Sequence, residues 1–171
     1  MIDNTTSSLW LKPIGTVYDE LSMLINELAR EHGSPRFEPH VTLISGLNSP
    51  IDHILNKIDK MSMPNNSVEI QLGKIGYKNN RFQSFFAHVE NEDIFSLREQ
   101  CKKAIGHQDI EEFMPHLSLM YHEMPEKKKE ALSKRLGDTL DMKFTATQIH
   151  VISTNGEPEE WKEIAAINLD D

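Results

Sequence analysis

Apolar residues follow helical spacing in four segments of the chain and form short runs between them. Recurrence at i, i+3, i+4 and i+7 predicts amphipathic helices. These lie at about residues 16–33, 50–58, 92–105 and 125–136. Short apolar runs bounded by glycine, proline or asparagine predict strands. These lie at about residues 8–12, 37–45, 68–77, 82–89, 116–121, 142–146, 149–153 and 161–169.

The order of these predicted elements is the same in both halves of the chain. Each half contains a helix, a strand, a second helix and a set of further strands. Asn79 and Asn80 suit a hairpin turn between two of the strands, because asparagine tolerates positive φ. The repeated order predicts a two-lobed α+β fold with a pseudo-two-fold axis. We expect one domain over residues 1–171, with pseudo-repeats at about 8–90 and 91–169.

One short run of residues occurs in both halves. Pro39–Leu43 (PHVTL) matches Pro115–Leu119 (PHLSL). In a strand, residues i and i+2 point to the same face, so each copy would present an imidazole and a hydroxyl side by side. Two copies that face a shared cleft would form a site with two histidines and two hydroxyl groups.

His40 and His116 are therefore candidates for an acid–base pair, with Thr42 and Ser118 as candidate phosphate ligands. An imidazole titrates near ~6.5, so at neutral pH one can take a proton from water while the other protonates a leaving oxygen. The hydroxyl groups can donate hydrogen bonds to non-bridging phosphate oxygens. A strained cyclic phosphate suits this set of groups, because its hydrolysis needs these elements and no metal. A single such pair is usually structural, but its repetition favours catalysis.

The doubled His-x-Thr/Ser motif resembles the 2H phosphoesterase superfamily. The flanking residues are more similar to one branch, the cyclic nucleotide phosphodiesterases (CPDases) of plants and fungi. The resembling segments are residues 8–10, 34–42, 114–121 and 160–165, so the resemblance covers nearly the whole chain. It implies a bilobal 2H phosphoesterase fold of the α+β class, with two antiparallel sheets and outer helices around a central cleft.

The resemblance also implies a reaction. The implied substrates are ADP-ribose 1″,2″-cyclic phosphate and nucleoside 2′,3′-cyclic phosphates, the latter hydrolysed to 2′-phosphates. The implied enzyme uses no metal or other cofactor and takes part in the metabolism of tRNA splicing by-products. In this sequence the two motif histidines would be the catalytic pair, and the two motif hydroxyls would hold the phosphate.

Three aromatic residues join the site through the same resemblance. Tyr121 would lie at the cleft, although strand parity places it on the opposite face from His116, so the strand would have to end or twist there. Trp10 and Phe82 would flank the base or the ribose. His88, His122 and Arg36 are weaker candidates for the cleft, its rim and a phosphate contact.

The net negative charge of the chain limits the classes of ligand that it is expected to bind. It has 27 acidic and 18 basic residues and a net charge of −9, whereas proteins that bind long nucleic acids usually carry a basic patch. The basic run Lys127–Lys129 lies among glutamates on a predicted helix and is interpreted as a solvated face. We therefore expect a small nucleotide substrate and no long nucleic acid. We also expect a monomer.

Cysteine content and hydropathy point to the cytoplasm. Cys101 is the only cysteine, which excludes an internal disulfide and suits a reducing compartment. No apolar run approaches the ~20 residues of a membrane span, and no signal peptide is evident. No cysteine or histidine pairing indicates a metal site. We expect a cytoplasmic protein with no membrane partner.

Two other functions fit the doubled motif. The first is a related 2H enzyme that acts on RNA 2′,3′-cyclic ends, or a 3′ exonuclease of the same superfamily. A basic stripe beside the cleft would favour this alternative. The second is a non-catalytic nucleotide-binding module, which would bind cyclic nucleotides without turnover.

Overall fold

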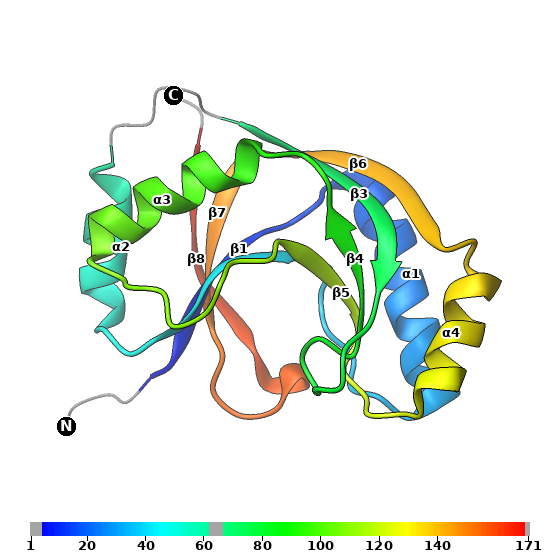
Figure 1. Ribbon diagram of the computed structural model, residues 1–171. Helices are drawn as coiled ribbons and strands as arrows, with labels where there is room; N and C mark the ends of the chain where they lie inside the picture. Colours follow the sequence, from blue (N-terminus) through cyan, green and yellow to red (C-terminus); the bar gives the residue numbers. More distant parts are fainter. Residues whose placement is uncertain (1–4, 62–66, 170–171) are drawn as a thin grey trace.

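The computed structural model describes residues 5–61 and 67–169 (Figure 1). All four helices and all eight strands expected from the sequence are present in this part of the chain. In order they are β1 (Ser7–Leu11), α1 (Gly15–His32), β2 (Val41–Leu47), α2 (Ile51–Asp59), β3 (Val68–Gly76), β4 (Phe85–Val89), α3 (Asp93–Ile105), β5 (His116–Met120), α4 (Glu126–Arg135), β6 (Thr139–Ala146), β7 (Gln148–Ser153) and β8 (Lys162–Asn168). A short 3₁₀ helix, Pro158–Glu160, precedes β8.

The strands form one antiparallel sheet in the order β6-β3-β4-β5-β2-β1-β7-β8. The two separate sheets expected from the sequence are therefore joined into one. The junction lies at the centre, where Val41 of β2 pairs with Leu117 of β5. These two residues belong to the two copies of the repeated motif. The junction of the half-sheets is thus also the place where the two motifs meet.

Each half of the sheet takes strands from both halves of the sequence. On one side, β3 and β4 pair with each other, and they also pair with β6 and β5 from later in the chain. On the other side, β7 and β8 join β1 and β2. The chain crosses between the half-sheets after α2 and again after β6. A contiguous half of the sequence therefore does not supply a complete half-sheet.

The helices cover the sheet in two groups. α2 and α3 lie together on one side of the molecule, and α1 and α4 lie on the other (Figure 1). The apolar stripe of α1 is buried at Leu21, Ile25 and Leu28, as its helical spacing predicts. These side chains join a continuous core of buried residues that includes Phe85 and Leu117 from the centre of the sheet. No helix in the described ranges is both long and apolar enough to cross a membrane.

Three local expectations differ from the structure. The first histidine strand begins at Val41 rather than near residue 37, because Pro39 has no N–H to donate to a strand ladder. β3 and β4 form the expected antiparallel hairpin, but their connection is a longer loop, residues 77–84, in place of a tight turn at Asn79 and Asn80. In this loop the Asn80 side chain accepts a hydrogen bond from the Gln83 N–H at 2.8 Å, which stabilises a wider turn.

The third difference concerns Lys129, which was expected on a solvated helix face. Its side chain is 2% exposed, and its ammonium group donates a hydrogen bond to the carbonyl of Lys78 at 2.7 Å. Burial lowers the pKa of Lys129. The helix α4 therefore uses this lysine to hold the loop of residues 77–84, which helical periodicity alone does not reveal.

Candidate active site

The two repeated motifs fold in the same way around their histidines. The Nδ1 atom of His40 lies 2.7 Å from the carbonyl oxygen of Glu38, and that of His116 lies 2.8 Å from the carbonyl oxygen of Met114. A carbonyl oxygen only accepts, so each Nδ1 carries a proton and donates it. In the neutral imidazole this leaves Nε2 unprotonated. Each histidine thus keeps one ring nitrogen free for proton transfer.

The pairing of β2 with β5 sets the arrangement of the four motif residues. Val41 lies opposite Leu117 in an antiparallel ladder. Extending this register by one residue in each direction places Thr42 beside His116 and His40 beside Ser118. Because directly opposed residues share a face, the two histidines and two hydroxyls come together on one side of the sheet. All four line a single cleft with a volume of about 690 Å³.

The cleft also contains the three aromatic residues expected there, Trp10, Phe82 and Tyr121. The strand β5 ends at Met120, so Tyr121 lies beyond it and strand parity no longer directs its ring away from the cleft. The Phe82 and Tyr121 ring centroids are 5.4 Å apart. Trp161 completes this wall, with its ring centroid 5.9 Å from that of Tyr121. One side of the cleft is therefore an aromatic surface suited to a base or a ribose.

The environment of the histidines changes their protonation. Burial lowers the pKa of His40 to about 3, and the hydrogen bond to the Glu38 carbonyl only partly offsets this effect. Burial also lowers the pKa of His116. Both imidazoles are therefore mainly neutral at pH 7 in the free protein, whereas the sequence led us to expect one neutral and one protonated ring. Burial raises the pKa of Tyr121, which keeps its phenol protonated.

The hydroxyl group of Ser118 has a partner in the free protein. Its Oγ atom donates a hydrogen bond to the carbonyl oxygen of Phe82 at 3.3 Å. This contact ties β5 to the loop of residues 77–84, which also brings Asn80 and Gln83 to the cleft. A hydroxyl group can rotate, so Ser118 can turn its proton from this carbonyl to a bound phosphate oxygen.

The weaker candidates from the sequence lie outside this cleft. His88 pairs with His116 across β4 and β5, and its ring packs against Phe86. Arg36 lines a separate cavity of about 550 Å³. Arg36 lies before the start of β2, so strand alternation does not place its side chain on the same face as that of His40. The carbonyl of His122 accepts a hydrogen bond from the Ser84 hydroxyl, and His122 does not line the cleft.

Several residues that line the cleft were not predicted from the sequence. Trp161 lies within a segment that carried the family resemblance, but no pattern showed which way its ring points. Ser8 has a usable signal, because it lies two residues before Trp10 on β1 and shares its face. Glu111 and Thr154 reach the cleft from loops that follow α3 and β7, and local periodicity says nothing of such loops. Among the described residues, no three His, Cys, Asp or Glu side chains are grouped to hold a metal ion.

Curated relatives match this chain over most of its length. A cyclic phosphodiesterase from Arabidopsis thaliana is 24% identical over 170 residues, which cover 95% of this chain and 94% of the relative. A 2′,3′-cyclic-nucleotide 3′-phosphodiesterase from Phaeosphaeria nodorum is 25% identical over 191 residues, covering 95% and 98%.

The fold is shared with known structures at much lower identity. The crystal structure of E. coli LigT complexed with 3′-AMP matches with a TM-score of 0.68 and 9% identity, over 98% of this chain and 99% of that one. The family model described as cyclic phosphodiesterase-like protein (CPDase) matches residues 5–169. The chain therefore belongs to the CPDase family of 2H phosphoesterases and is a cyclic phosphodiesterase.

Proposed function

We propose that this enzyme hydrolyses nucleoside 2′,3′-cyclic phosphates to 2′-phosphates, with His40 and His116 as an acid–base pair. The observation that carries this proposal is the pair of imidazoles whose Nδ1 atoms are held by carbonyl oxygens, so that both Nε2 atoms are free in one cleft. The fungal relative is named as an enzyme for 2′,3′-cyclic nucleotides that acts at the 3′ position. We also propose ADP-ribose 1″,2″-cyclic phosphate as a substrate of the same site.

The proposed reaction is an attack of water on phosphorus. The unprotonated Nε2 of one histidine takes a proton from water as the P–O bond forms. The P–O3′ bond breaks, and the protonated Nε2 of the other histidine gives its proton to O3′. The products are a 2′-phosphate and a free 3′-hydroxyl. One histidine gains a proton as the other loses one, so the pair holds the same total, and exchange with solvent restores the starting forms. Thr42 and Ser118 donate hydrogen bonds to the non-bridging oxygens as charge develops on them.

Substrate binding can provide the protonated histidine that the reaction needs, with the proton taken from solvent. Burial keeps both histidines mainly neutral in the free protein at neutral pH. The cyclic phosphate brings one negative charge into the cleft, and a nearby negative charge raises the pKa of an imidazole. Binding of the substrate therefore favours protonation of one histidine of the pair. In this proposal the histidine that acts as the acid becomes protonated at neutral pH mainly when the substrate is bound.

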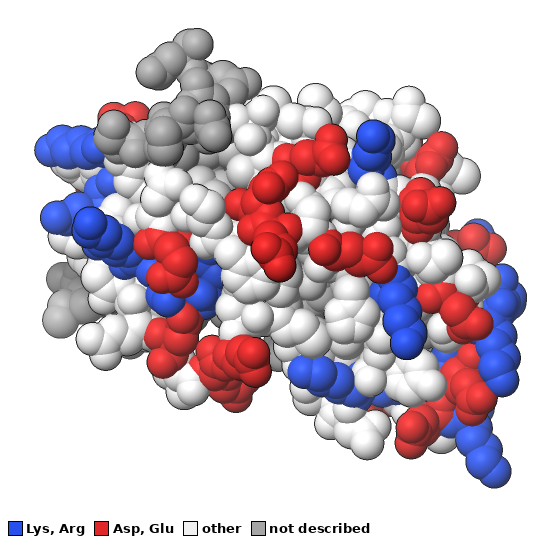
Figure 2. All heavy atoms as spheres, turned by 45° about the horizontal axis from the view of Figure 1, so that its top comes forward, with Lys and Arg blue, Asp and Glu red and all other residues white. Residues whose placement is uncertain are grey.

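The charge of the cleft supports a small substrate over RNA. Among the described residues that line it there is no lysine or arginine, and Glu111 adds a carboxylate. Figure 2 shows acidic side chains near the middle of the displayed face and basic ones mainly towards its edges, without a continuous basic stripe. Since long nucleic acids are bound through their phosphates, these features argue against an RNA end or a 3′ exonuclease substrate. We further propose a monomeric, cytoplasmic enzyme, which gel filtration and cell fractionation would test.

The presence of the full set of groups argues against a non-catalytic binding module. Both imidazoles and both hydroxyls line the cleft, and each imidazole donates its Nδ1 proton to a carbonyl oxygen, which leaves Nε2 unprotonated as proton transfer would require. A binding module has no requirement for two free Nε2 atoms. It would bind a cyclic nucleotide and leave it intact.

The test is incubation of the pure protein with a nucleoside 2′,3′-cyclic phosphate in excess chelator, with the product identified by phosphorus NMR. We expect a 2′-phosphate from the wild type and nearly complete loss of product with His40→Ala and with His116→Ala. His53→Ala is the matched control, because His53 is exposed on α2 and does not line the cleft. Binding without turnover by the wild type would support the binding module, and cleavage of a short RNA alone would support the RNA alternative.

A further inference from the structure

The two catalytic histidines of the proposed reaction are held by different means. His116 is the first residue of β5 and pairs with His88 of β4, so the strand ladder supports its backbone. His40 precedes β2, which begins at Val41, so its own residue lies outside the strand. Its orientation depends on the hydrogen bond to the carbonyl of Glu38. Whatever holds Glu38 in place therefore also holds His40.

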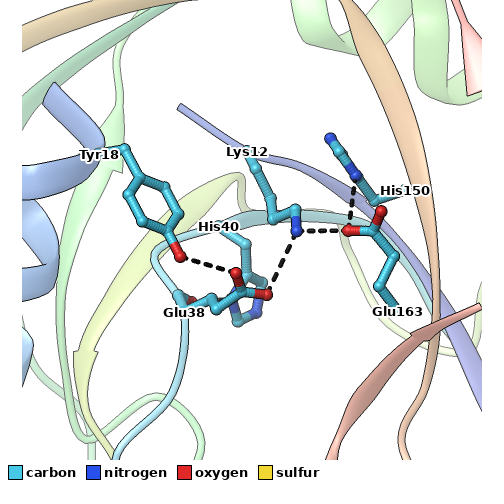
Figure 3. A network of polar contacts seen from close by, with 6 residues as sticks. All are labelled: Lys12, Tyr18, Glu38, His40, His150 and Glu163. Carbon is cyan, nitrogen blue, oxygen red and sulfur yellow. Dashed lines mark hydrogen bonds and ion pairs between the residues drawn. The ribbon is translucent and has the colours of Figure 1, made fainter. Parts of the chain in front are cut away.

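The side chain of Glu38 is fixed by two neighbours (Figure 3). The Tyr18 hydroxyl donates a hydrogen bond to one carboxylate oxygen at 2.7 Å. The Lys12 ammonium lies 3.2 Å from the other oxygen. Tyr18 belongs to α1, and Lys12 follows the end of β1. The residue that orients His40 is thus tied to two separate elements of the fold.

Lys12 extends this network to the far edge of the sheet. Its ammonium also lies 2.5 Å from a carboxylate oxygen of Glu163 on β8. The same oxygen is 3.0 Å from Nδ1 of His150 on β7 (Figure 3). The Lys12 side chain is only 11% exposed, so its charge is partly shielded from water and depends on these two carboxylates. One cation therefore links the Glu38 segment to the outer strands.

The same strands support the other side of His40. Trp10 lies two residues before Lys12 and pairs with His150 across β1 and β7. Its indole ring stacks on the imidazole of His40. The Glu38 carbonyl thus holds the edge of the ring and Trp10 covers its face. Both supports depend on β1, the strand that leads into Lys12.

Among the residues that the structure describes, the second motif has no equivalent network. The residue that accepts the hydrogen bond from His116 is Met114, whose side chain cannot form an ion pair. The two motifs are alike in sequence and in the backbone contact of their histidines. They differ in what anchors that contact, and this difference is visible only in the structure.

We propose that Lys12, together with Tyr18 and the carboxylates of Glu38 and Glu163, is a positioning device for His40. It keeps the Glu38 carbonyl aligned with Nδ1 of His40, so that Nε2 stays aimed at the substrate. This inference rests on the proposed function, in which His40 takes part in proton transfer. Loss of Lys12 would leave two carboxylates without their shared cation and release the segment that orients His40. These residues do not touch the reacting atoms and act through His40.

The test compares Lys12→Met with Lys12→Arg, which restores the cation. We expect Lys12→Met to lower kcat by up to about 100-fold while KM changes little, because a misplaced proton-transfer group slows the chemical step more than binding. Lys12→Arg recovers most of the loss. Arg135→Met is the matched control, because it removes an exposed ion pair between α4 and Glu31 of α1, on the same helix as Tyr18 but outside the cleft.

A second readout separates positioning from general loss of structure. In spectra of the protein labelled with ¹⁵N at histidine, we expect the Nδ1–H signal of His40 to shift and exchange faster with water in Lys12→Met. The corresponding signal of His116 serves as an internal control and stays unchanged. Equal disturbance of both histidines, or a large drop in the unfolding temperature that explains the lost activity, would overturn the proposal.

The experiment also distinguishes failure of this inference from failure of the proposed function. If His40→Ala retains activity, the proposed function fails, whatever Lys12 does. If His40→Ala is inactive but Lys12→Met keeps full activity and an unchanged His40 signal, the positioning role alone is wrong. Tyr18→Phe gives an independent check, since it removes one hydrogen bond of Glu38 and leaves the ion pairs intact.

Discussion

The imidazole of His40 lies flat against the indole of Trp10, with ring centroids 3.5 Å apart and planes inclined by only 8°. This contact shields one face of the histidine from water, and the residue as a whole is 3% exposed. Shielding is the main reason for the low pKa of His40, because a charged imidazole loses its hydration there. Trp10 therefore helps to lower the pKa of His40 and also forms part of the wall of the cleft.

Replacement of Trp10 should change the titration of His40. In Trp10→Leu the smaller side chain admits water, so we expect the pKa of His40 to rise from about 3 towards its usual value. Activity should fall as well, because the ring loses the surface that holds it flat. NMR titration of the histidine signals measures the pKa directly. Trp10→Phe keeps an aromatic face and should stay close to the wild type; an unchanged pKa in Trp10→Leu would contradict this account.

The pH dependence of the reaction should differ between the free enzyme and its complex. The profile of kcat/KM reports the free enzyme. In the free enzyme both histidine pKa values lie below the usual 6.5. The fraction of enzyme with one protonated histidine therefore already falls as the pH rises towards 6.5. We therefore expect kcat/KM to be greatest below pH 6.5 and to fall above it.

The profile of kcat reports the complex, in which the bound phosphate raises the histidine pKa values. We expect it to be displaced to higher pH than the profile of kcat/KM. Steady-state kinetics from about pH 4 to 9 measure both. The apparent pKa values on the acidic and basic sides of each profile belong to the coupled pair of histidines rather than to one residue each. A profile that is flat over this range would rule out paired imidazole catalysis.

The two motif hydroxyls should affect kcat more than KM. In the proposed reaction, Thr42→Val and Ser118→Ala each remove a donor to a non-bridging phosphate oxygen, and loss of one such donor typically costs about 100-fold or more in kcat. Ser118→Ala also frees the Phe82 carbonyl from its contact at 3.3 Å. Comparison of the two variants by steady-state kinetics separates the shared role from the loop contact. An effect confined to KM would show that the hydroxyls bind the ground state only.

Glu111 should weaken the binding of the more highly charged product relative to that of the substrate. The cyclic substrate carries one negative charge, whereas a 2′-phosphate carries close to two at neutral pH. A carboxylate in a cleft lined by no lysine or arginine among the described residues repels the product more than the substrate. We expect Glu111→Lys to bind the 2′-phosphate several-fold more tightly and to show stronger product inhibition. The effect should weaken at high salt, since Glu111 is exposed; equal product inhibition in both proteins would contradict it.

The periodicity of the sequence is enough to predict the secondary structure and the two histidine–hydroxyl pairs that line the cleft. Helical and strand spacing are properties of the backbone, so they appear in the sequence wherever one face of an element is buried. For the same reason, the spacing of His40 and Thr42 and of His116 and Ser118 already shows that each pair shares a face. Where the sequence misled, a local rule was overridden by a specific contact, as in the burial of Lys129 against the Lys78 carbonyl.

Contacts between residues far apart in the chain could not be predicted in this way. The pairing of Val41 with Leu117, the position of Trp161 and the bridge from Lys12 to Glu38 and Glu163 all join separate elements. The sequence by itself determined which groups are proposed to do the chemistry, because the spacing of each histidine and its hydroxyl is local. Only the tertiary structure decided how they face one another, how burial shifts their pKa values and what holds His40, because these depend on the packing of elements that no local pattern links.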